Sequence, residues 1–234
     1  MGDSRHVFRL LRRLEYPDTL ESVHLHLTGC EGTVDSEFLE PYLRDRIQRD
    51  GRFRSRPVGI QASNATNPIS FDIGVLGELD TVTMFGYPSV SFFAAFRGGF
   101  SRGAAEGLLP NLIAATPREN VVYFAGEPSI HAARDLFVTM PNIDNLYLVG
   151  SVVSDAFLRP DPLSHSKLLP SLRHLSLDYF TLENDDDWRP LVAYLAYQTS
   201  GGQTVSLSLH SHRPRIPPEV VSEIEGLVEE FILG

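Results

Sequence analysis

A short apolar pattern recurs in the second half of the sequence at a nearly constant interval. It consists of an apolar residue, two others, a second apolar residue, one other and a third apolar residue. The stretches MPNIDNLYL (140–148) and LPSLRHLSL (169–177) both carry it, 29 residues apart. Its positions are Ile143, Leu146, Leu148 and Leu172, Leu175, Leu177. Alternating apolar and polar residues are typical of a strand with one buried face, so each stretch predicts a short strand.

Further copies of the pattern lie on both sides. Their apolar positions are Leu20, Val23, Leu25, then Leu79, Val82, Met84 and, in part, Val205, Leu207, Leu209. Leu177 follows Leu148 by 29 residues, and Leu207 follows Leu177 by 30. Met84 lies two such intervals after Leu25, and Leu148 lies two intervals and a few inserted residues after Met84. Leucine-rich repeats have periods of about 20–29 residues with one strand per repeat, so the spacing predicts a repeat architecture.

The segment after residue 177 carries the signals of a helix. Acidic residues 185–187 and Pro190 suit the first turn of a helix. An apolar stripe follows through Trp188, Leu191 and Leu195, which favours a core role for Trp188 over a role as interface anchor. Gly201 and Gly202 then end the helix before the next strand.

Other segments predict helices and extended stretches. Helices are expected over 38–48, 103–115, 129–140 and, as a final amphipathic helix, 217–232. The expected buried face of the final helix is Val220, Ile224, Leu227, Val228 and Phe231. Between 54 and 98 the helical signal fades, and 56–62, 70–76 and 89–96 resemble strands or extended loops.

These elements together predict an α/β fold. We expect an irregular leucine-rich-repeat solenoid of about six to seven units, with a curved, mostly parallel sheet and helices on its convex side. Residues 1–19 would form an N-terminal capping helix, and 20–234 a repeat domain that ends in the capping helix 217–232. A doubly wound α/β sheet is the rival, but its central strands are near-continuous apolar runs, and no Gly-rich phosphate loop follows any strand here.

In such a sheet the apolar strand positions point inward and the residues between them face outward on the concave side. The inward set is Val23, Leu25, Val82, Met84, Leu146, Leu148, Leu175, Leu177, Leu207 and Leu209. The outward set is His24, His26, Thr81, Thr83, Asn145, Tyr147, His174, Ser176, Ser206, Ser208 and His210. These outward residues are polar or aromatic and mostly uncharged, so the sequence predicts that they contact a protein or peptide partner.

Composition and motifs argue against several other functions. The net charge of -10 and pI near 5.2 lack the basic face that nucleic acid needs. No apolar run reaches the length of about 18 residues that a membrane span requires. The motifs of phosphate binding, zinc proteolysis and serine hydrolysis are absent, so we assign no catalytic or cofactor residue and expect no enzyme.

Metal binding is also not expected. The pairs His24–His26 and His210–His212 each place two imidazoles on one strand face, but no third ligand is indicated. Residues 185–187 are consecutive acids, which suit a helix start better than a calcium loop with alternating ligands. Cys30, the single cysteine, favours a reducing compartment and a buried thiol over a nucleophile.

Several long stretches resemble one protein family. The segment 169–209, LPSLRHLSLDYFTLENDDDWRPLVAYLAYQTSGGQTVSLSL, and the later GLVEEFIL resemble the C-terminal leucine-rich region of fungal F-box proteins. FLEPYLRDRIQRDGRF (38–53) and TPRENVVYF (116–124) are similar to its middle portion. The likeness covers residues 20–233 and is strongest after 140.

The resemblance implies a substrate-selecting role. In that family an N-terminal F-box recruits the adaptor of a cullin-based ubiquitin ligase, and the repeats select the substrate. The residues before Leu20 are too few for an F-box, so we do not expect the adaptor as a partner. This expectation fits a fragment, a truncated gene model or a paralogue without the motif, in the cytoplasm or nucleus.

Two other hypotheses remain open. A small α/β enzyme would have a deep pocket at the carboxyl ends of its strands, with a perturbed acid or base, or Cys30, inside it. A non-functional remnant would fold poorly, because solenoids need caps at both ends and residues 1–19 are a thin cap.

Overall fold

The computed structural model describes ten parts of the chain. They are residue 13 and residues 22–28, 36–63, 69–76, 90–97, 116–126, 137–149, 168–178, 188–210 and 216–234. In 22–28, 36–40, 62–63, 69–72 and 90–97 only the backbone is described. The chain divides into two compact units, unit 1 (Met1–Val122) and unit 2 (Tyr123–Gly234). The division falls inside the range 20–234 that the sequence predicts as one repeat domain.

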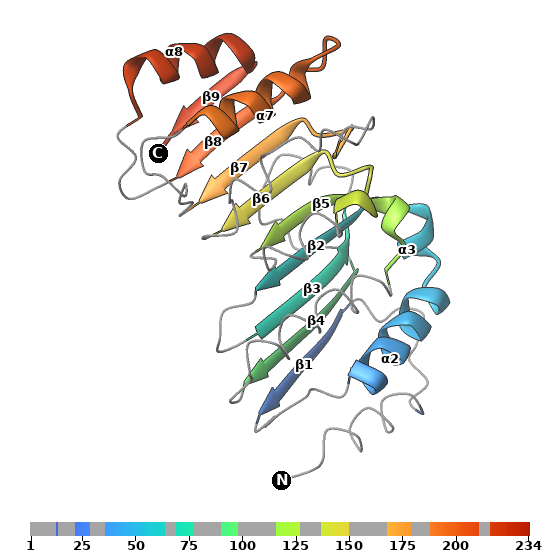
Figure 1. The fold of residues 1–234 in the computed structure, drawn as a ribbon. Helices are drawn as coiled ribbons and strands as arrows, with labels where there is room; N and C mark the ends of the chain where they lie inside the picture. The colour runs from blue at the N-terminus through green and yellow to red at the C-terminus, as the bar shows by residue number, and fades with distance from the viewer. Residues whose placement is uncertain are drawn as a thin grey trace. The chain divides into compact units, whose positions relative to one another are not determined.

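Unit 1 combines strands of both directions with helices (Figure 1). Its described strands are β1 (Ser22–Thr28), β2 (Val58–Ser63), β3 (Ile69–Val75) and β4 (Val90–Arg97), in the spatial order β1-β4-β3-β2. β1 runs parallel to β4, whereas β3 is antiparallel to both β4 and β2. The helices are α2 (Ser36–Arg49), α3 (Arg52–Ser55) and the 3-10 turn η1 (Arg118–Asn120).

The core of unit 1 follows from strand alternation and from one face of α2. Val58 and Ile60 lie opposite Val75 and Ile73 across the β2–β3 pair, and all four are buried. The described helical residues add Tyr42, Leu43, Ile47 and Phe53 to this core. Residues 56–62 and 70–76, which resemble extended segments in the sequence, thus form a hairpin with one buried face.

Unit 2 is a sheet of parallel strands (Figure 1). Its described strands are β5 (Val121–Gly126, of which Tyr123–Gly126 lie in this unit), β6 (Asn145–Val149), β7 (His174–Asp178), β8 (Ser206–His210) and β9 (Glu230–Leu233). They follow one another in space in chain order, with α7 (Arg189–Thr199) before β8 and α8 (Pro218–Leu227) before β9. α7 and α8 pack against each other.

In unit 2, the residues on the apolar face of neighbouring strands line up in register. One row is Phe124, Leu146, Leu175, Leu207 and Phe231, and the next is Gly126, Leu148, Leu177, Leu209 and Leu233. All of them are buried except the half-buried Phe231 and the exposed Leu233 of the last strand. The leucines of β6, β7 and β8 are at most 2% exposed, so each contributes about 1.5–3 kcal/mol relative to an exposed side chain. Layered α/β packing places the helices over this apolar face.

Glutamine side chains join successive returns of unit 2. Gln198, fully buried near the end of α7, donates from Nε2 to the carbonyl of Leu168 at 2.6 Å. Gln203 donates in the same way to the carbonyl of Leu172 at 2.6 Å. Each bond satisfies a carbonyl 30 or 31 residues earlier in the chain, just before β7. The amides therefore fix the position of the α7–β8 connection on the preceding strand.

The observed pairing confirms the predicted α/β class and its mostly parallel strands. Among the described residues, five of the seven strand pairs within the units are parallel. Leu146 pairs with Leu175 and Leu148 with Leu177, at the interval that the sequence predicts. Leu79, Val82 and Met84 lie outside the described residues, as do the predicted helices over 103–115 and over most of 129–140 and 1–19.

Three sequence predictions need correction. Leu207 pairs with Leu175, and not with Leu177 as the interval in the sequence predicts; a slip of two residues keeps the same face buried, so the pattern did not reveal it. The final helix ends at Leu227, and Glu230–Leu233 form β9 beside β8. Trp188 is buried but precedes α7 as its N-cap residue.

Candidate functional site

The structure places the predicted outward residues in different parts of the chain. His24 and His26 lie in β1 of unit 1, where only the backbone is described, and Thr81 and Thr83 lie outside the described residues. The other seven belong to β6, β7 and β8 of unit 2: Asn145, Tyr147, His174, Ser176, Ser206, Ser208 and His210. They alternate with the buried leucines and so share one face of the sheet.

Register brings these seven residues into rows across the strands. Asn145, His174 and Ser206 form the first row, and Tyr147, Ser176 and Ser208 form the second. Parallel pairing adds Tyr123 of β5 and Glu230 of β9 to the first row and Ile232 of β9 to the second, and Asp178 lies beside His210 in a third row. We call the part of this set on β5 to β8 the polar face: Tyr123, Asn145, Tyr147, His174, Ser176, Asp178, Ser206, Ser208 and His210.

Tyr123 and Asp178 were not predicted as members of the polar face. Asp178 is the next alternate residue after His174 and Ser176, so strand periodicity alone could have found it. Tyr123 follows only from the pairing of β5 with β6, which places it beside Asn145. Burial raises the pKa of the Tyr123 phenol, so this hydroxyl stays protonated and can donate a hydrogen bond at neutral pH.

Tyr147 and Asp178 are joined by a side-chain hydrogen bond across the β6–β7 pair. The Tyr147 hydroxyl donates to Oδ2 of Asp178 at 2.7 Å. A hydrogen bond to an ionised acceptor is stronger than one between neutral groups, and it holds both side chains in a fixed geometry. Both residues are half-buried, so the pair remains reachable from one side.

Ser176 differs from its neighbours on the polar face. The sequence predicts an accessible contact residue, but Ser176 is only 5% exposed, between Tyr147 and Ser208 in the second row. Its Oγ has no hydrogen-bond partner among the described residues. An unpaired buried hydroxyl costs about 1–3 kcal/mol, and its burial places Ser176 below the surface that a partner would contact.

The charges around the polar face are unbalanced. Unit 2 contains 15 acidic and 7 basic residues, a formal net charge of −8, against 15 and 13 in unit 1, which give −2. Among the described residues of the polar face Asp178 is the one carboxylate, and none is Lys or Arg. His174 is exposed, and Asn145, Ser206, Ser208 and His210 are half-buried.

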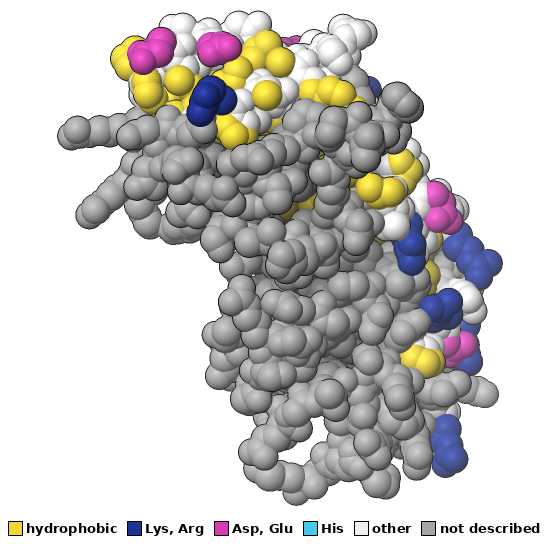
Figure 2. Space-filling model, viewed as in Figure 1, with side chains coloured by type: hydrophobic (Ala, Val, Ile, Leu, Met, Phe, Trp, Pro, Cys, Tyr) yellow, Lys and Arg dark blue, Asp and Glu magenta, His cyan; other side chains and the backbone are white. Residues whose placement is uncertain are grey.

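Unit 1 carries a second distinctive surface, rich in arginine. Arg44, Arg49, Arg54 and Arg56 of α2 and α3 are exposed, and Figure 2 shows dark blue side chains gathered over these helices. No carboxylate of the described residues forms an ion pair with Arg54 or Arg56. Asn120 donates from Nδ2 to the carbonyls of Phe53 and Arg54 at 3.0 and 2.8 Å, which fixes η1 against α3.

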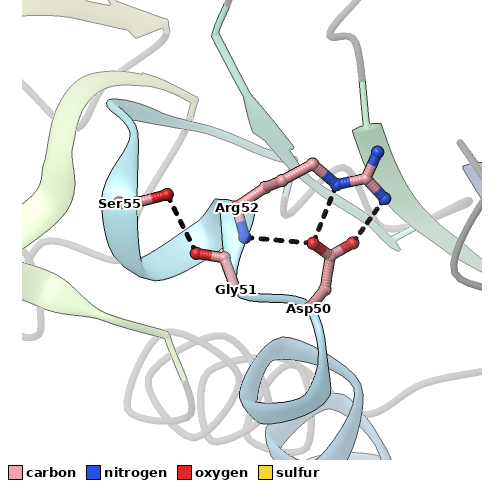
Figure 3. A network of polar contacts seen from close by, with 4 residues as sticks. All are labelled: Asp50, Gly51, Arg52 and Ser55. Atoms are coloured by element: carbon pink, nitrogen blue, oxygen red, sulfur yellow. Dashed lines mark hydrogen bonds and ion pairs between the residues drawn. The ribbon is translucent and has the colours of Figure 1, made fainter.

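The junction between α2 and α3 is held by a compact polar network (Figure 3). Arg52 donates from Nε and Nη2 to the two carboxylate oxygens of Asp50, both at 2.8 Å, and from its backbone N–H at 3.1 Å. Arg52 holds the pKa of Asp50 below its ordinary value. Ser55 donates to the carbonyl of Gly51 at 3.0 Å. The network stabilises a local turn, so we assign it a structural role.

The described residues also bear on metal sites and membrane spans. Among them, no group of three or more His, Cys, Asp or Glu side chains is placed to hold a metal ion. His212, Cys30 and the acidic residues 185–187 lie outside the described parts. In those same described parts, every helix is too short or too polar to cross a lipid bilayer.

Comparison with known proteins identifies no relative of this chain. Protein-family models, curated proteins and solved structures were each searched, and none of them matches the chain.

Proposed function

We propose that the chain is a leucine-rich-repeat module that binds a protein partner on the polar face of unit 2. The observation that carries the proposal is the in-register alternation of β6, β7 and β8. Fully buried leucines occupy one face, and the other carries polar or aromatic side chains that are uncharged apart from Asp178. Such side chains are common in protein interfaces, where Tyr supplies much of the binding energy.

The spacing of the parallel strands supports the repeat assignment. Paired residues in β5 to β9 are 22, 29, 32 and 24 residues apart, close to the period of about 20–29 residues in leucine-rich repeats. Each repeat consists of a short strand and a return, and α7 and α8 are the helical returns before the last two strands. We propose that this arrangement is the regular part of an irregular solenoid with a curved sheet.

The dimensions of the polar face favour a polypeptide partner. Strands in a sheet are about 4.8 Å apart, so β5 to β8 present a strip about 14 Å wide. An extended chain advances about 3.3 Å per residue, so roughly four residues of a partner segment would cross the strip. Binding of this kind requires no catalytic group, and we propose no enzymatic activity.

The resemblance to F-box proteins supports a specific biological role. We propose that the partner is a protein selected for ubiquitination, as the repeats of that family select substrates. The residues of the polar face would contact this substrate, and none of them is proposed to contact the cullin adaptor. The module would act in the cytoplasm or nucleus, where such ligases operate.

Affinity capture with matched variants tests the proposal. The full chain, a Tyr147→Ala/His174→Ala variant and a Ser222→Ala/Glu223→Ala control on α8 would be immobilised and exposed to the same cell lysate. We expect the wild type and the control to retain the same partner, and the polar-face variant to lose it at an almost unchanged melting temperature. Equal retention by all three would contradict the proposal, and stable retention of the cullin adaptor would contradict its second part.

A further inference from the structure

Two carboxylates lie on this side of the sheet, Asp178 on the polar face and the exposed Glu230 of β9 in register with Ser206. The other described side chains of β5 to β8 on this face are Tyr123, Ala125, Asn145, Tyr147, Val149, His174, Ser176, Ser206, Ser208 and His210. None of them is Lys or Arg. The carboxylates therefore set the sign of the charge that this face attracts at neutral pH.

The contacts of Asp178 leave part of its acceptor capacity unused. Oδ2 accepts the hydroxyl of Tyr147, and no other hydrogen bond or ion pair among the described residues reaches the carboxylate. A carboxylate offers about four lone-pair sites, and a neutral hydroxyl cancels none of its charge. Oδ1 of the half-buried Asp178 is thus oriented by the Oδ2 bond and accepts no hydrogen bond from the described residues.

An aromatic ring lies beside this carboxylate. Tyr147 is on β6, the strand paired with β7, and its hydroxyl donates to Asp178, so the two side chains are in contact. Ser176 lies on the same side of β7, but its Oγ is buried and a partner cannot reach it. A carboxylate and an aromatic ring are therefore gathered on two adjacent strands.

We infer that the polar face recognises an arginine side chain of its partner, with the Asp178 carboxylate as acceptor and the ring of Tyr147 as a platform. The inference rests on the proposed function and names the group that the partner contributes. A guanidinium presents five N–H donors in a planar fork and stacks on aromatic rings, whereas the ammonium of lysine is a compact point charge. One arginine can therefore bond the carboxylate and lie on the ring at the same time, so arginine is preferred over lysine.

The charge distribution of the chain supports the same ligand. The formal charge of −8 in unit 2 attracts cationic segments and repels acidic ones over distances of about 8–10 Å at physiological salt. The exposed His174 adds a donor or acceptor in the neighbouring row without a fixed positive charge. The face is thus suited to a short basic segment with polar neighbours.

Peptide selection on the full chain tests the inference. A phage-displayed library of random twelve-residue peptides would be selected on the wild type, on Asp178→Asn and on Glu223→Gln. The last variant removes the same charge from α8 and serves as the control. We expect arginine to be enriched on the wild type and on Glu223→Gln, and the enrichment to disappear on Asp178→Asn. Circular dichroism would show that all three remain folded.

A double-mutant cycle then isolates the contact. One selected peptide would be synthesised with its arginine and with citrulline, which has the same shape and no charge. We expect citrulline to weaken binding to the wild type at least tenfold, and to weaken binding to Asp178→Asn by less than twofold. Lysine in place of arginine should reduce wild-type affinity about fivefold.

The outcomes separate this inference from the proposed function. Arginine enrichment that survives in Asp178→Asn, or enrichment of acidic peptides, would overturn the inference. Partner capture that depends on Tyr147 and His174 but not on Asp178 would also overturn it, while the proposed function would stand. Capture that depends on none of the three residues would overturn both.

Discussion

The two units pair their strands differently, and the described strands of unit 1 have 6–8 residues whereas those of unit 2 have 4–6. In unit 2 every described strand pair is parallel, whereas in unit 1 β3 is antiparallel to both of its neighbours. The connection from β2 to β3 is short (64–68), and those from β5 to β9 are long (127–144, 150–173, 179–205 and 211–229). A parallel pair needs a crossover of about a dozen residues or more. The length of the connection therefore accounts for the antiparallel β2–β3 hairpin and permits the parallel pairs of unit 2.

The units also differ in the charge of their helices. In α2, α3 and the turn between them, residues 44–56 contain six arginines and two aspartates. Residues 216–234, which include α8 and β9, contain five glutamates and no basic residue. A binding face in unit 2 therefore lies in an acidic surrounding, whereas helices α2 and α3 of unit 1 would attract anions.

Removing a core leucine from unit 2 should have the largest effect. Leu175 is 1% exposed and lies between Leu146 and Leu207 in the sheet. We expect Leu175→Ala to lower the free energy of unfolding by about 2–5 kcal/mol, because the cavity adds to the lost burial. Urea denaturation would measure the loss, and hydrogen exchange should show it in the amides of β6 to β8.

The matched variant in unit 1 is Ile73→Ala. Ile73 is fully buried opposite Ile60, so a loss of about 2–5 kcal/mol is again expected, with exchange increased in β2 and β3. If both variants accelerate exchange in the same amides, the units unfold as one cooperative body and do not differ in this respect.

A backbone substitution tests the long connections of unit 2. Gly202 has φ of +85° in the turn between α7 and β8, and an added Cβ would meet no atom within 4 Å. Gly202→Ala should therefore cost about 1–2 kcal/mol through backbone strain alone. Gly226→Ala in α8, with equal space, should instead stabilise by about 0.5–1 kcal/mol. Thermal unfolding should show a lower melting temperature for Gly202→Ala and a higher one for Gly226→Ala. A change in the same direction in both variants would contradict the role assigned to the positive φ of Gly202.

The short turn of unit 1 depends on an ion pair and hence on pH. We expect Asp50→Asn to lower the free energy of unfolding by about 1 kcal/mol at pH 7. The loss is modest because Arg52 is partly exposed, so solvent weakens the ion pair. Because Arg52 lowers the pKa of Asp50 below its ordinary value of 3.8, this stabilisation is present above that pH. It is lost as the pH falls through the lowered pKa.

Unfolding measured from pH 7 to pH 2 should show that the stabilities of the wild type and of Asp50→Asn converge as the pH falls. Asp45→Asn is the control, because the Asp45–Arg49 pair on α2 is more exposed, at 39% and 62%. We expect this variant to lose only about 0.3–0.5 kcal/mol. An equal loss in both variants would indicate that burial does not distinguish the two pairs.

Ser176→Ala should have the smallest effect. Its hydroxyl is buried without a partner, so its removal is expected to leave stability unchanged or to raise it by up to about 1 kcal/mol. Ser208→Ala, at a half-buried neighbour in the same row, should change stability by no more than about 0.5 kcal/mol. A loss above about 1 kcal/mol in Ser176→Ala would show that the hydroxyl is bonded in the free protein.

The sequence predicts the parallel part of the fold better than the rest. β6 and β7 repeat the same pattern at one interval, and helix-ending glycines at 201 and 202 both have positive φ. The register of β8 was wrong by two residues, because a period of two cannot distinguish such shifts. The direction of β3 required the length of the β2–β3 connection, which hydrophobic alternation does not report.

The last helix was extended too far for a similar reason. Val228 and Phe231 satisfy helical spacing after Ile224 and Leu227, but Phe231 also alternates with Leu233 as residues of a strand would. Pairing with β8 places Phe231 beside Leu207, and this tertiary contact outweighs the helical pattern.

For the candidate site, the sequence predicts most residues of the polar face but not the contacts and burial of their side chains. Asn145, Tyr147, His174, Ser176, Ser206, Ser208 and His210 were expected from alternation and lie together in unit 2. The bond between Tyr147 and Asp178 joins residues 31 positions apart, so it depends on the pairing of two strands. The burial of Ser176 likewise depends on its neighbours in space and not on its place in the pattern.

β9 has a practical consequence for handling the protein. It is the last described strand of unit 2, it has only four residues, and Ile232 and Leu233 are 45% and 52% exposed. Short length and the adjacent charges of Glu229 and Glu230 are the features that keep such edges from templating fibres. Fusions and substitutions at this end of the chain should therefore keep both glutamates and should add no apolar residue beside Ile232 and Leu233.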